Sequence, residues 1–409
     1  MASQWITAEE AQSRLGVKIQ TLYAYASRGL IANRTDADDP RRSLYAVDDI
    51  NRLTLRKQRG RRAAVAQEAL SFGEPVLASS ITTISGGRLY YRGQDAVLLS
   101  EKAKLEDTAR LLWGAGEEDP FATLTPHPNP VSGPDARTRA FFALSHRAAS
   151  DPAMSGRSDQ ALRREAASVL TDLVDVMCGS TRGGPLHERV ARAWRIEGAK
   201  ADAVRRALVL TADHELNAST FAARVAASTG ATLGACALAG LATLSGPLHG
   251  GMTAQVTAFF AEARRANDPK SAAMQRLAQG LDVPGFGHPL YPLGDPRAAA
   301  IARSVRFSDE ALAIMQAGEQ VTGSPANLDF ALVALCRTLG LPADAPFAIF
   351  TIGRTAGWMA HAIEQRGSGG GIIRPRARYV GIQPGTLDLP RAVNDTAPPE
   401  AEALAEAME

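Results

Sequence analysis

The chain has 409 residues and a formal net charge of +2; 45% of its residues are apolar and 6% are aromatic. A chain of this length and composition buries a sizeable core in two or three domains, which excludes a disordered protein. The three cysteines lie far apart without metal-binding spacing, which excludes a disulfide framework and is typical of reduced thiols in the cytoplasm. Because alanine is abundant and strand-like alternation is scarce, we expect a mainly helical protein.

Neither a secretory signal nor a membrane span is expected. The N-terminus lacks the basic flank and apolar run of a signal peptide. Residues 225–247 carry no charge and are long enough to cross a bilayer. Their Ala, Gly, Ser and Thr content makes them weakly hydrophobic, so we expect a buried helix and no membrane association.

Two short helices are predicted near the N-terminus. Thr7 and Glu10 have the spacing of a capping box, which predicts a helix that starts after Thr7 and ends at Gly16. A second helix is expected over residues 19–29, where a glycine ends it. Two short helices about a tight turn are typical of a helix-turn-helix.

The next segment is expected to complete a small basic domain. A polar loop over residues 36–42 returns at residues 44–45, and a third helix starts near residue 47 and ends in the Arg-rich residues 56–62. Residues 1–64 contain twelve Lys or Arg and seven Asp or Glu, a charge of +5 that leaves −3 for the remainder. The basic excess therefore belongs to the first domain.

Residues 1–62 resemble the winged helix-turn-helix of the MerR and excisionase families. The motifs that carry the resemblance are W-I-T-A-E-E-A, S-R-G-L-I and L-Y-A-V-D-D-I. The resemblance implies that the second helix enters a DNA major groove while basic residues contact phosphates. The residues expected at DNA are Arg28, Arg41 and Arg42. The alternative is a docking or dimerisation module whose basic run is a solvated helix face.

A hairpin and a long helical region are expected next. Gly86-Gly87 separates two short runs that are typical of strands joined by a tight turn. Helical periodicity resumes near residue 98, with Pro- and Gly-rich interruptions at residues 115–134 and 182–185. We expect His187, next to the second interruption, to be an ordinary surface or core histidine.

Polar residues interrupt the apolar helices in two places. Residues 213–220, D-H-E-L-N-A-S-T, need partners in the protein or in a ligand, and they lack a second metal ligand at helical spacing. His249 stands in G-P-L-H-G-G at the expected start of a helix. The helix dipole there disfavours the imidazolium, so we expect a neutral His249 that donates a hydrogen bond to an oxyanion or enolate.

The loop at residues 284–297, P-G-F-G-H-P-L-Y-P-L-G-D-P-R, brings a histidine and an arginine together. Its glycines and prolines make it bent and stiff, so His288 is expected to be held in place. Asp295 is the expected N-cap and Pro296 the first residue of the next helix, which puts Arg297 in the first turn. The alternative is that His288 merely caps a turn.

Two later helices each carry a single notable charge. Asp329 is expected in the first turn of a helix, where the dipole favours the carboxylate that a general base needs; taken alone, the position is typical of an ordinary helix start. Arg354 lies in an apolar helix at residues 347–366 and needs a partner in the protein or a ligand carboxylate. Residues 367–371 lack the preceding strand and the Lys-Ser/Thr of a phosphate-binding loop.

Residues 75–385 resemble the citrate synthase family. The motifs that carry the resemblance, in order, are YRG, DHELNAST, GPLHGG, GFGH with DPRA, NLDF, GRTAGWMAH and RPRARYVG. The resemblance implies large and small helical domains that close over the substrates, a homodimer or larger homo-oligomer, and no cofactor or metal. The implied reaction is a Claisen-type condensation of acetyl-CoA with oxaloacetate, followed by hydrolysis of citryl-CoA to citrate and CoA.

The resemblance also implies a role for each matching residue. His249 and Asp329 flank the acetyl-CoA methyl group, and His288 binds the oxaloacetate carbonyl. The residues implied to hold the other oxaloacetate oxygens are His214, Arg297, Arg354 and Arg374. Contacts with CoA are expected from Gly285, Phe286, Gly287 and Asn327.

Two features depart from the family pattern, and two functional alternatives stay open. Residues 252–253, Met-Thr, replace the usual Ala-Asn, and residues 289–292 replace Arg-Val-Tyr-Lys. One alternative is a 2-methylcitrate synthase that uses propionyl-CoA, because one methylene changes discrimination by only about 1 to 3 kcal/mol. The other is a DNA-binding regulator in which the large domain senses a metabolite.

The expected organisation is therefore mainly α-helical, with a small winged helix-turn-helix domain in front of two larger helical domains. The expected bounds are 1–62 for the helix-turn-helix domain, 63–250 and 341–409 for the large domain with its C-terminal tail, and 251–340 for the small domain.

Overall fold

The computed structural model describes residues 5–27, 30–36, 39, 42–51, 77–122, 124, 133–179, 183–369, 371–377 and 379–381. The chain divides into two units, Met1–Ser80 and Ile81–Glu409, which are described separately. The expected boundary at residue 62 lies outside the described residues.

The first unit begins with two short helices. The predicted capping box is confirmed: the Glu10 amide donates to Thr7 Oγ1, and the Thr7 amide donates to the Glu10 carboxylate. Helix α1 spans Ala8–Leu15 and ends at Gly16, whose φ of 59° is the left-handed conformation that glycine adopts easily. Helix α2 spans Ile19–Ser27.

A three-stranded antiparallel sheet accompanies these helices. Its strands are β1 (Trp5–Ile6), β2 (Asn33–Thr35) and β3 (Ser43–Ala46), in the order β1-β3-β2. Leu22, Ile31, Tyr45 and Ile50 lie in the small core of this unit. The returning strand and a helical start at residue 47 match the prediction, whereas the identification as a helix-turn-helix stays a prediction.

Only part of the expected DNA-binding set can be placed. Arg28, Arg41 and the Arg-rich residues 56–62 lie outside the described residues. Arg42 is exposed and forms an ion pair with Asp39 at 3.2 Å. An exposed ion pair of this kind adds little stability, so this guanidinium can exchange its partner.

The second unit begins with the predicted hairpin. Strands β4 (Thr82–Ser85) and β5 (Arg88–Tyr91) pair antiparallel, and β6 (Gln94–Asp95) follows. Gly86 and Gly87 have φ values of 57° and 72°, as a tight two-residue hairpin turn requires.

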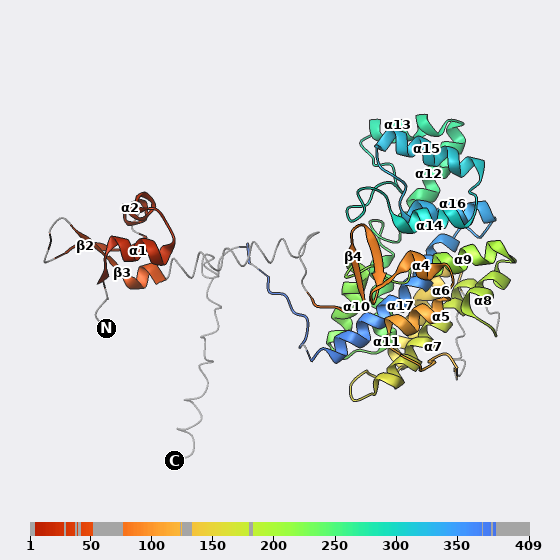
Figure 1. Ribbon diagram of the computed structural model, residues 1–409, viewed down its shortest axis with the longest axis horizontal. Helices are drawn as coiled ribbons and strands as arrows, with labels where there is room; N and C mark the ends of the chain where they lie inside the picture. The colour runs from red at the N-terminus through yellow and green to blue at the C-terminus, as the bar shows by residue number, and fades with distance from the viewer. Residues whose placement is uncertain are drawn as a thin grey trace, which may run out of the picture. The chain divides into compact units, whose positions relative to one another are not determined.

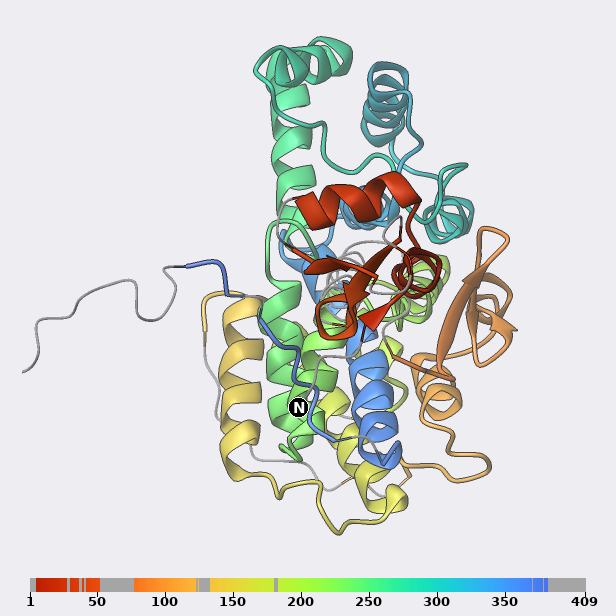
Figure 2. The same cartoon turned by 90° about the vertical axis from the view of Figure 1, so that its left-hand side faces the viewer.

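Helices make up the rest of the unit. The main group consists of α4 (Ala96–Ser100), α5 (Leu105–Leu112), α6 (Ala136–Ser150), α7 (Asp159–Cys178), α8 (Leu186–Ala193), α9 (Ala199–Leu210), α10 (Ala218–Ser228), α11 (Leu233–Leu244) and α17 (Ala345–Gly367). A second group consists of α12 (Met252–Ala266), α13 (Pro269–Ala278), α14 (Pro296–Ser304), α15 (Asp309–Thr322) and α16 (Leu328–Leu339). Both views show α12 reaching from the main group to α13 at the far end of the second group (Figures 1 and 2).

Helix α17 is the centre of the main group. It packs against α5, α7, α9, α10 and α11, and almost all of its side chains are buried. The uncharged stretch at residues 225–247 contains α11, which packs between α6, α10 and α17 as the predicted buried helix. Among the described residues, no helix combines the length and apolar character that a membrane span requires.

Two glycines let a neighbouring turn approach α17 closely. A Cβ added at Gly353 would lie 2.0 Å from Thr211 Oγ1, and one at Gly357 would lie 2.5 Å from the carbonyl oxygen of Ala212. The Gly357 amide donates to that same carbonyl at 3.0 Å. The turn that leads into the polar cluster is therefore fixed against α17.

Candidate active site

The loop that carries His288 is bonded to the start of α16. The Asn327 amide donates to Gly285 O at 2.9 Å, and the Gly287 amide donates to Pro325 O at 2.8 Å. Gly285 and Gly287 have φ values of 93° and 73°, which explains why glycine is needed at both positions. His288 and the first turn of α16 are thus held next to each other.

The same contacts bear on the residues expected to bind CoA. The side chain of Asn327 donates to Gly287 O and accepts from the amides at the start of α16. The ring of Phe286 packs against that of Phe330, with 5.2 Å between centroids, and lies where a Cβ on Gly318 would be. These groups shape the loop, and their contact with CoA stays a prediction.

His288 is held in one tautomer. Its Nδ1 accepts a hydrogen bond from the Leu290 amide at 3.1 Å, so Nδ1 carries no hydrogen and Nε2 does. Burial and the nearby Arg297 guanidinium lower the pKa of His288 to about 4. His288 is therefore a neutral hydrogen-bond donor at physiological pH, more than a turn cap.

Arg297 is clamped by the residue that caps its helix. Asp295 caps α14 by accepting from the Arg297 amide, as predicted, and its carboxylate also binds Arg297 Nε and Nη2 at 2.9 and 2.7 Å. Both side chains are buried. Burial alone would raise the pKa of Asp295, but Arg297 holds it below its ordinary value. In the described part of the chain Arg297 Nη1 has no hydrogen-bond partner, which leaves it available for a ligand.

His214 joins a cluster of three rings. Its Nε2 lies 3.0 Å from the Tyr291 hydroxyl, and its ring centroid lies 5.2 Å from that of His288. Tyr291 and His288 are 5.0 Å apart by the same measure. Burial, followed by the charges of Arg297 and Arg354, holds the pKa of His214 well below its ordinary value. Tyr291 was not predicted to belong to the site, although it lies in the same loop as His288.

Arg354 is buried without a carboxylate partner among the described residues. Its Nε donates to Thr211 O at 3.0 Å, and its guanidinium carbon lies 5.1 Å from the centre of the Phe350 ring. Burial lowers its pKa to about 10, so the guanidinium keeps its charge at neutral pH. A buried cation of this kind is ready to bind a ligand carboxylate.

His249 lies in the turn before α12. Its Nε2 is 2.9 Å from Ser219 Oγ, and the indole of Trp358 donates to the same hydroxyl at 3.2 Å. The pKa of His249 falls to about 4, chiefly through burial and then through Arg354. The neutral state was predicted from the helix dipole, but His249 precedes the N-cap, Gly251, and these two causes take its place.

Asp329 lies in the first turn of α16, as predicted. One of its carboxylate oxygens, Oδ1, is buried and has no hydrogen-bond partner among the residues that the structure describes. Burial raises its pKa to about 7, although Arg297 and Arg354 lower it in part. The expectation that the helix dipole keeps this group ionised is therefore corrected: loss of hydration outweighs the dipole.

Arg374 is not brought to these residues. It is exposed on an extended segment, residues 371–377, which is attached to the end of α10 by a hydrogen bond from the Ile373 amide to Ser228 Oγ at 3.0 Å. Within the described residues Arg374 makes no hydrogen bond or ion pair. His187, on α8, is largely buried and lies outside the site, as expected.

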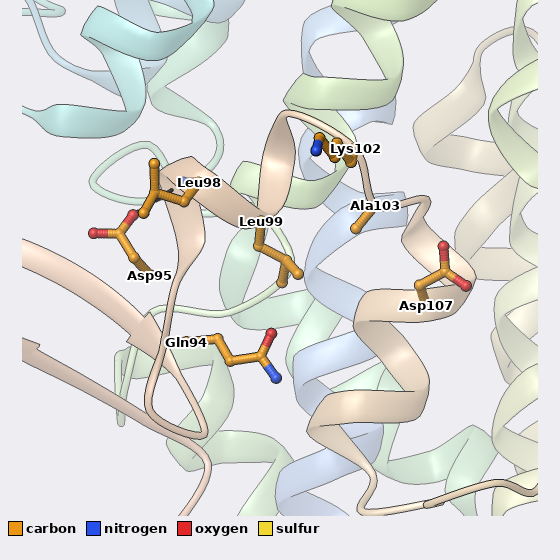
Figure 3. A pocket seen from close by; sticks show the side chains of 7 residues that line it. All are labelled: Gln94, Asp95, Leu98, Leu99, Lys102, Ala103 and Asp107. Atoms are coloured by element: carbon orange, nitrogen blue, oxygen red, sulfur yellow. Dashed lines mark hydrogen bonds between the residues drawn. The ribbon is translucent and has the colours of Figure 1, made fainter.

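A surface pocket lies outside the candidate active site. Its volume is about 580 Å³, and it opens beside α4 (Figure 3). Its lining residues are Gln94, Asp95, Leu98, Leu99, Lys102, Ala103 and Asp107. None of the predicted catalytic residues is among them. The described residues contain no group of three His, Cys, Asp or Glu side chains arranged to hold a metal ion.

Comparison with known proteins shows what this chain is similar to. A family model described as "Citrate synthase, C-terminal domain" matches residues 142–376. "Putative citrate synthase 2" of Mycobacterium tuberculosis is 31% identical over 330 residues, which cover 73% of this chain and 88% of that protein. The 2-methylcitrate synthase of Shewanella oneidensis is 33% identical over 190 residues, 43% of this chain and 50% of that one. The structure of citrate synthase from Thermotoga maritima aligns with a TM-score of 0.61 at 25% identity, covering 76% of this chain and 94% of that chain.

Proposed function

Because this chain belongs to the citrate synthase family of acyl-transferring enzymes, we propose that it condenses acetyl-CoA with oxaloacetate and hydrolyses the citryl-CoA formed to citrate and CoA. The observation that carries the proposal is a set of neutral histidines and one acid of raised pKa, all close enough to the buried Arg297 or Arg354 for its charge to shift their pKa values. The histidines are neutral and Asp329 is partly ionised near neutral pH, which supports their proposed roles as donors and base.

Oxaloacetate would be bound through its carboxylates and polarised at its ketone. Arg354 and Arg297 Nη1 are the donors for the carboxylates, and a guanidinium suits this geometry. His288 Nε2–H donates to the ketone oxygen, where negative charge develops as the new carbon–carbon bond forms. His214, held by Tyr291, adds a neutral polar edge next to His288.

Acetyl-CoA would lose a methyl proton to Asp329. A base with a pKa of about 7 is well matched to work near neutral pH. His249 donates to the thioester oxygen of the enolate through Nδ1–H. In this structure the Ser219 hydroxyl donates to Asn217 Oδ1 at 2.8 Å and accepts from the Trp358 N–H, so His249 Nε2 carries the hydrogen and donates to Ser219 Oγ. The Nδ1–H tautomer requires the Ser219 hydroxyl to turn from Asn217 to Nε2 when acetyl-CoA binds.

Release of free CoA thiol by the purified protein tests this function. Acetyl-CoA and propionyl-CoA are compared, each with oxaloacetate, and we expect a higher kcat/KM for acetyl-CoA. The second candidate, 2-methylcitrate synthesis, is favoured by the similarity to the Shewanella oneidensis protein. A clear preference for propionyl-CoA would select it, and no thiol release with either would refute both.

The exposed position of Arg374 supports action as a homodimer in which Arg374 completes the site of the other copy. Exposed Ile372 on this segment, with exposed Tyr379 and Val380 farther along the chain, supplies an apolar surface for that contact. Mixing subunits of the inactive variants Arg374→Ala and Asp329→Ala should restore about 25% of wild-type activity, because half of the dimers are mixed and each has one intact site. If Arg374 acts within its own chain, mixing restores nothing.

DNA binding by residues 1–62 is a separate proposal, supported by the +5 charge of residues 1–64 and by two short helices next to an antiparallel sheet. It predicts binding to a DNA fragment that weakens steeply with salt and is lost on replacing Arg28 together with the basic residues of segment 56–62. Salt-independent or absent binding would leave this unit as a docking module. A regulator without catalysis would bind DNA and release no thiol.

A further inference from the structure

A hydrogen-bonded network of three buried polar side chains lies next to the proposed active site, and the proposed reaction does not use it. Arg224 on α10 contacts His361 on α17, with 3.3 Å between Nη1 and Nδ1. His361 Nε2 in turn lies 3.2 Å from Asp213 Oδ2. All three side chains are at most 2% exposed. Buried polar groups of this kind need a physical reason to be present.

The direction of each hydrogen bond in this network can be assigned. A guanidinium only donates, so the Arg224 contact requires His361 Nδ1 to accept and to carry no hydrogen. The hydrogen of the neutral imidazole then lies on Nε2 and is donated to Asp213. Arg224 is itself held by the Glu364 carboxylate at 2.8 Å and by Gln365 Oε1 at 2.9 Å. His361 therefore presents one fixed donor to Asp213.

Asp213 connects this network to the groups proposed to bind oxaloacetate. It directly precedes His214, and the preceding turn binds Arg354 through Thr211 O. Burial alone would raise the pKa of its carboxyl, but His361 and Arg354 hold it below its ordinary value. The nearby Thr82 hydroxyl also lowers that pKa, although within the described part of the chain neither it nor Asp213 Oδ1 makes a hydrogen bond of normal geometry.

The space around Asp213 is limited by α17. A Cβ added at Gly357 would lie 2.2 Å from Asp213 Oδ1, so the carboxylate rests directly on the helix backbone. Residues 354, 357 and 361 share one face of α17 because they are three and four positions apart. The carboxylate thus lies on the helix face that carries both Arg354 and His361.

We infer that His361, oriented by Arg224, is a positioning residue that holds the Asp213 carboxylate away from Arg354 and so keeps the guanidinium free for a substrate carboxylate. Without the donor on His361, a buried Asp213 anion satisfies itself by turning to Arg354. That pairing occupies the guanidinium and disturbs the adjacent His214. The inference rests on the proposed function only in taking oxaloacetate as the ligand.

Two substitutions at His361 test the roles of the two imidazole nitrogens separately. The amide nitrogen of His361→Gln reaches the position of Nε2 and keeps a donor for Asp213. The shorter His361→Asn places its carbonyl near the position of Nδ1, where it accepts from Arg224 but leaves Asp213 without a donor. Both variants lose the ring, so a role in packing alone would affect them alike.

Calorimetric titration with oxaloacetate measures the outcome. We expect the Kd to rise about tenfold in His361→Asn, the effect of one charge-assisted hydrogen bond, and to stay within about twofold of wild type in His361→Gln. His187→Asn, at a histidine outside the site, is the matched control and should leave the Kd unchanged. Melting curves accompany each protein.

Equal Kd values for the two His361 variants would overturn the inference, and so would a His361→Asn protein that no longer melts cooperatively, because either result assigns His361 a purely structural role. Thiol release by the wild-type protein judges the proposed function separately. A protein that shows the predicted contrast in Kd but releases no thiol would refute that function and retain this inference. A wild-type protein that does not bind oxaloacetate would refute both.

Discussion

The close approach of residues 211–213 to α17 makes Gly357→Ala a sharp test of how the site is built. The added methyl group would lie 2.2 Å from Asp213 Oδ1 and 2.5 Å from Ala212 O. It would also push away the carbonyl that accepts from the Gly357 amide at 3.0 Å. The turn must therefore move away from α17, and Thr211 O, which binds Arg354 Nε, moves with it.

The size of the effect follows from three contributions. Overpacking a closed site costs about 1 to 3 kcal/mol, and weakening the Gly357 hydrogen bond costs about 1 kcal/mol. Alanine returns about 1 kcal/mol through its higher helix propensity. The free energy of unfolding should thus fall by about 1 to 3 kcal/mol, with a melting temperature lower by a few degrees. Oxaloacetate affinity should fall as well, because Arg354 and His214 both depend on the displaced turn.

Thermal unfolding and oxaloacetate titration of the purified protein measure both quantities. Gly367→Ala is the matched control, because Gly367 ends the same helix and, apart from that helix's own backbone, no atom of the described residues lies within 4 Å of its added Cβ. The free energy of unfolding of this control should equal that of the wild-type protein or exceed it by up to about 1 kcal/mol, and its oxaloacetate affinity should be unchanged. If Gly357→Ala behaved like Gly367→Ala in both measurements, the turn would not need its contact with α17, and the reasoning would be wrong.

Three further predictions concern the catalytic groups. Asp329→Asn should lower kcat by about 10² to 10⁴-fold, the usual worth of a general base, with oxaloacetate affinity little changed; near-normal turnover would contradict the role of Asp329. Because the pKa of Asp329 is raised to about 7 and the base must be ionised, kcat/KM for acetyl-CoA should rise about tenfold from pH 6 to pH 8, and a flat profile would show that another group is the base. His249 and His288, with pKa values of about 4, stay neutral over that range. Arg354→Lys keeps the charge but loses the planar fork, so the oxaloacetate KM should rise at least about tenfold, and an unchanged KM would remove Arg354 from the binding set.

Local patterns in the sequence predicted much of the framework of the site. The Asp295-Pro296 pair starts a helix, and Gly86-Gly87 makes a hairpin turn, because each outcome depends on neighbouring residues alone. The apolar helix around Arg354 was recognised for the same reason. That Arg354 would need a partner also followed, because an isolated cation in an apolar helix is costly.

Contacts between segments distant in the chain could not be predicted in this way. Tyr291 meets His214 across 77 positions, and His361 meets Asp213 across 148. No spacing rule connects such residues. The same limit applies to the predicted protonation states. For His249 and Asp329 the sequence pointed only to the helix dipole, whereas burial by distant segments is the main cause of both pKa shifts.

The arginines and the histidines of the site constrain one another. Burial lowers the pKa of His214, His249 and His288, and in each case a nearby arginine lowers it further. The histidines therefore donate hydrogen bonds without adding positive charge to a pocket that already holds two guanidinium groups.

Of these two guanidinium groups, Arg297 is neutralised by Asp295 in a bidentate pair, whereas Arg354 has no such ion pair among the described residues. The proposed dicarboxylate substrate would thus meet one guanidinium without an ion pair, one guanidinium nitrogen without a hydrogen-bond partner among the described residues, and neutral imidazoles, so it would not have to displace an existing ion pair. The same arrangement leaves Asp329 half ionised near neutral pH, which suits a base that must take up a proton and give it back in each cycle.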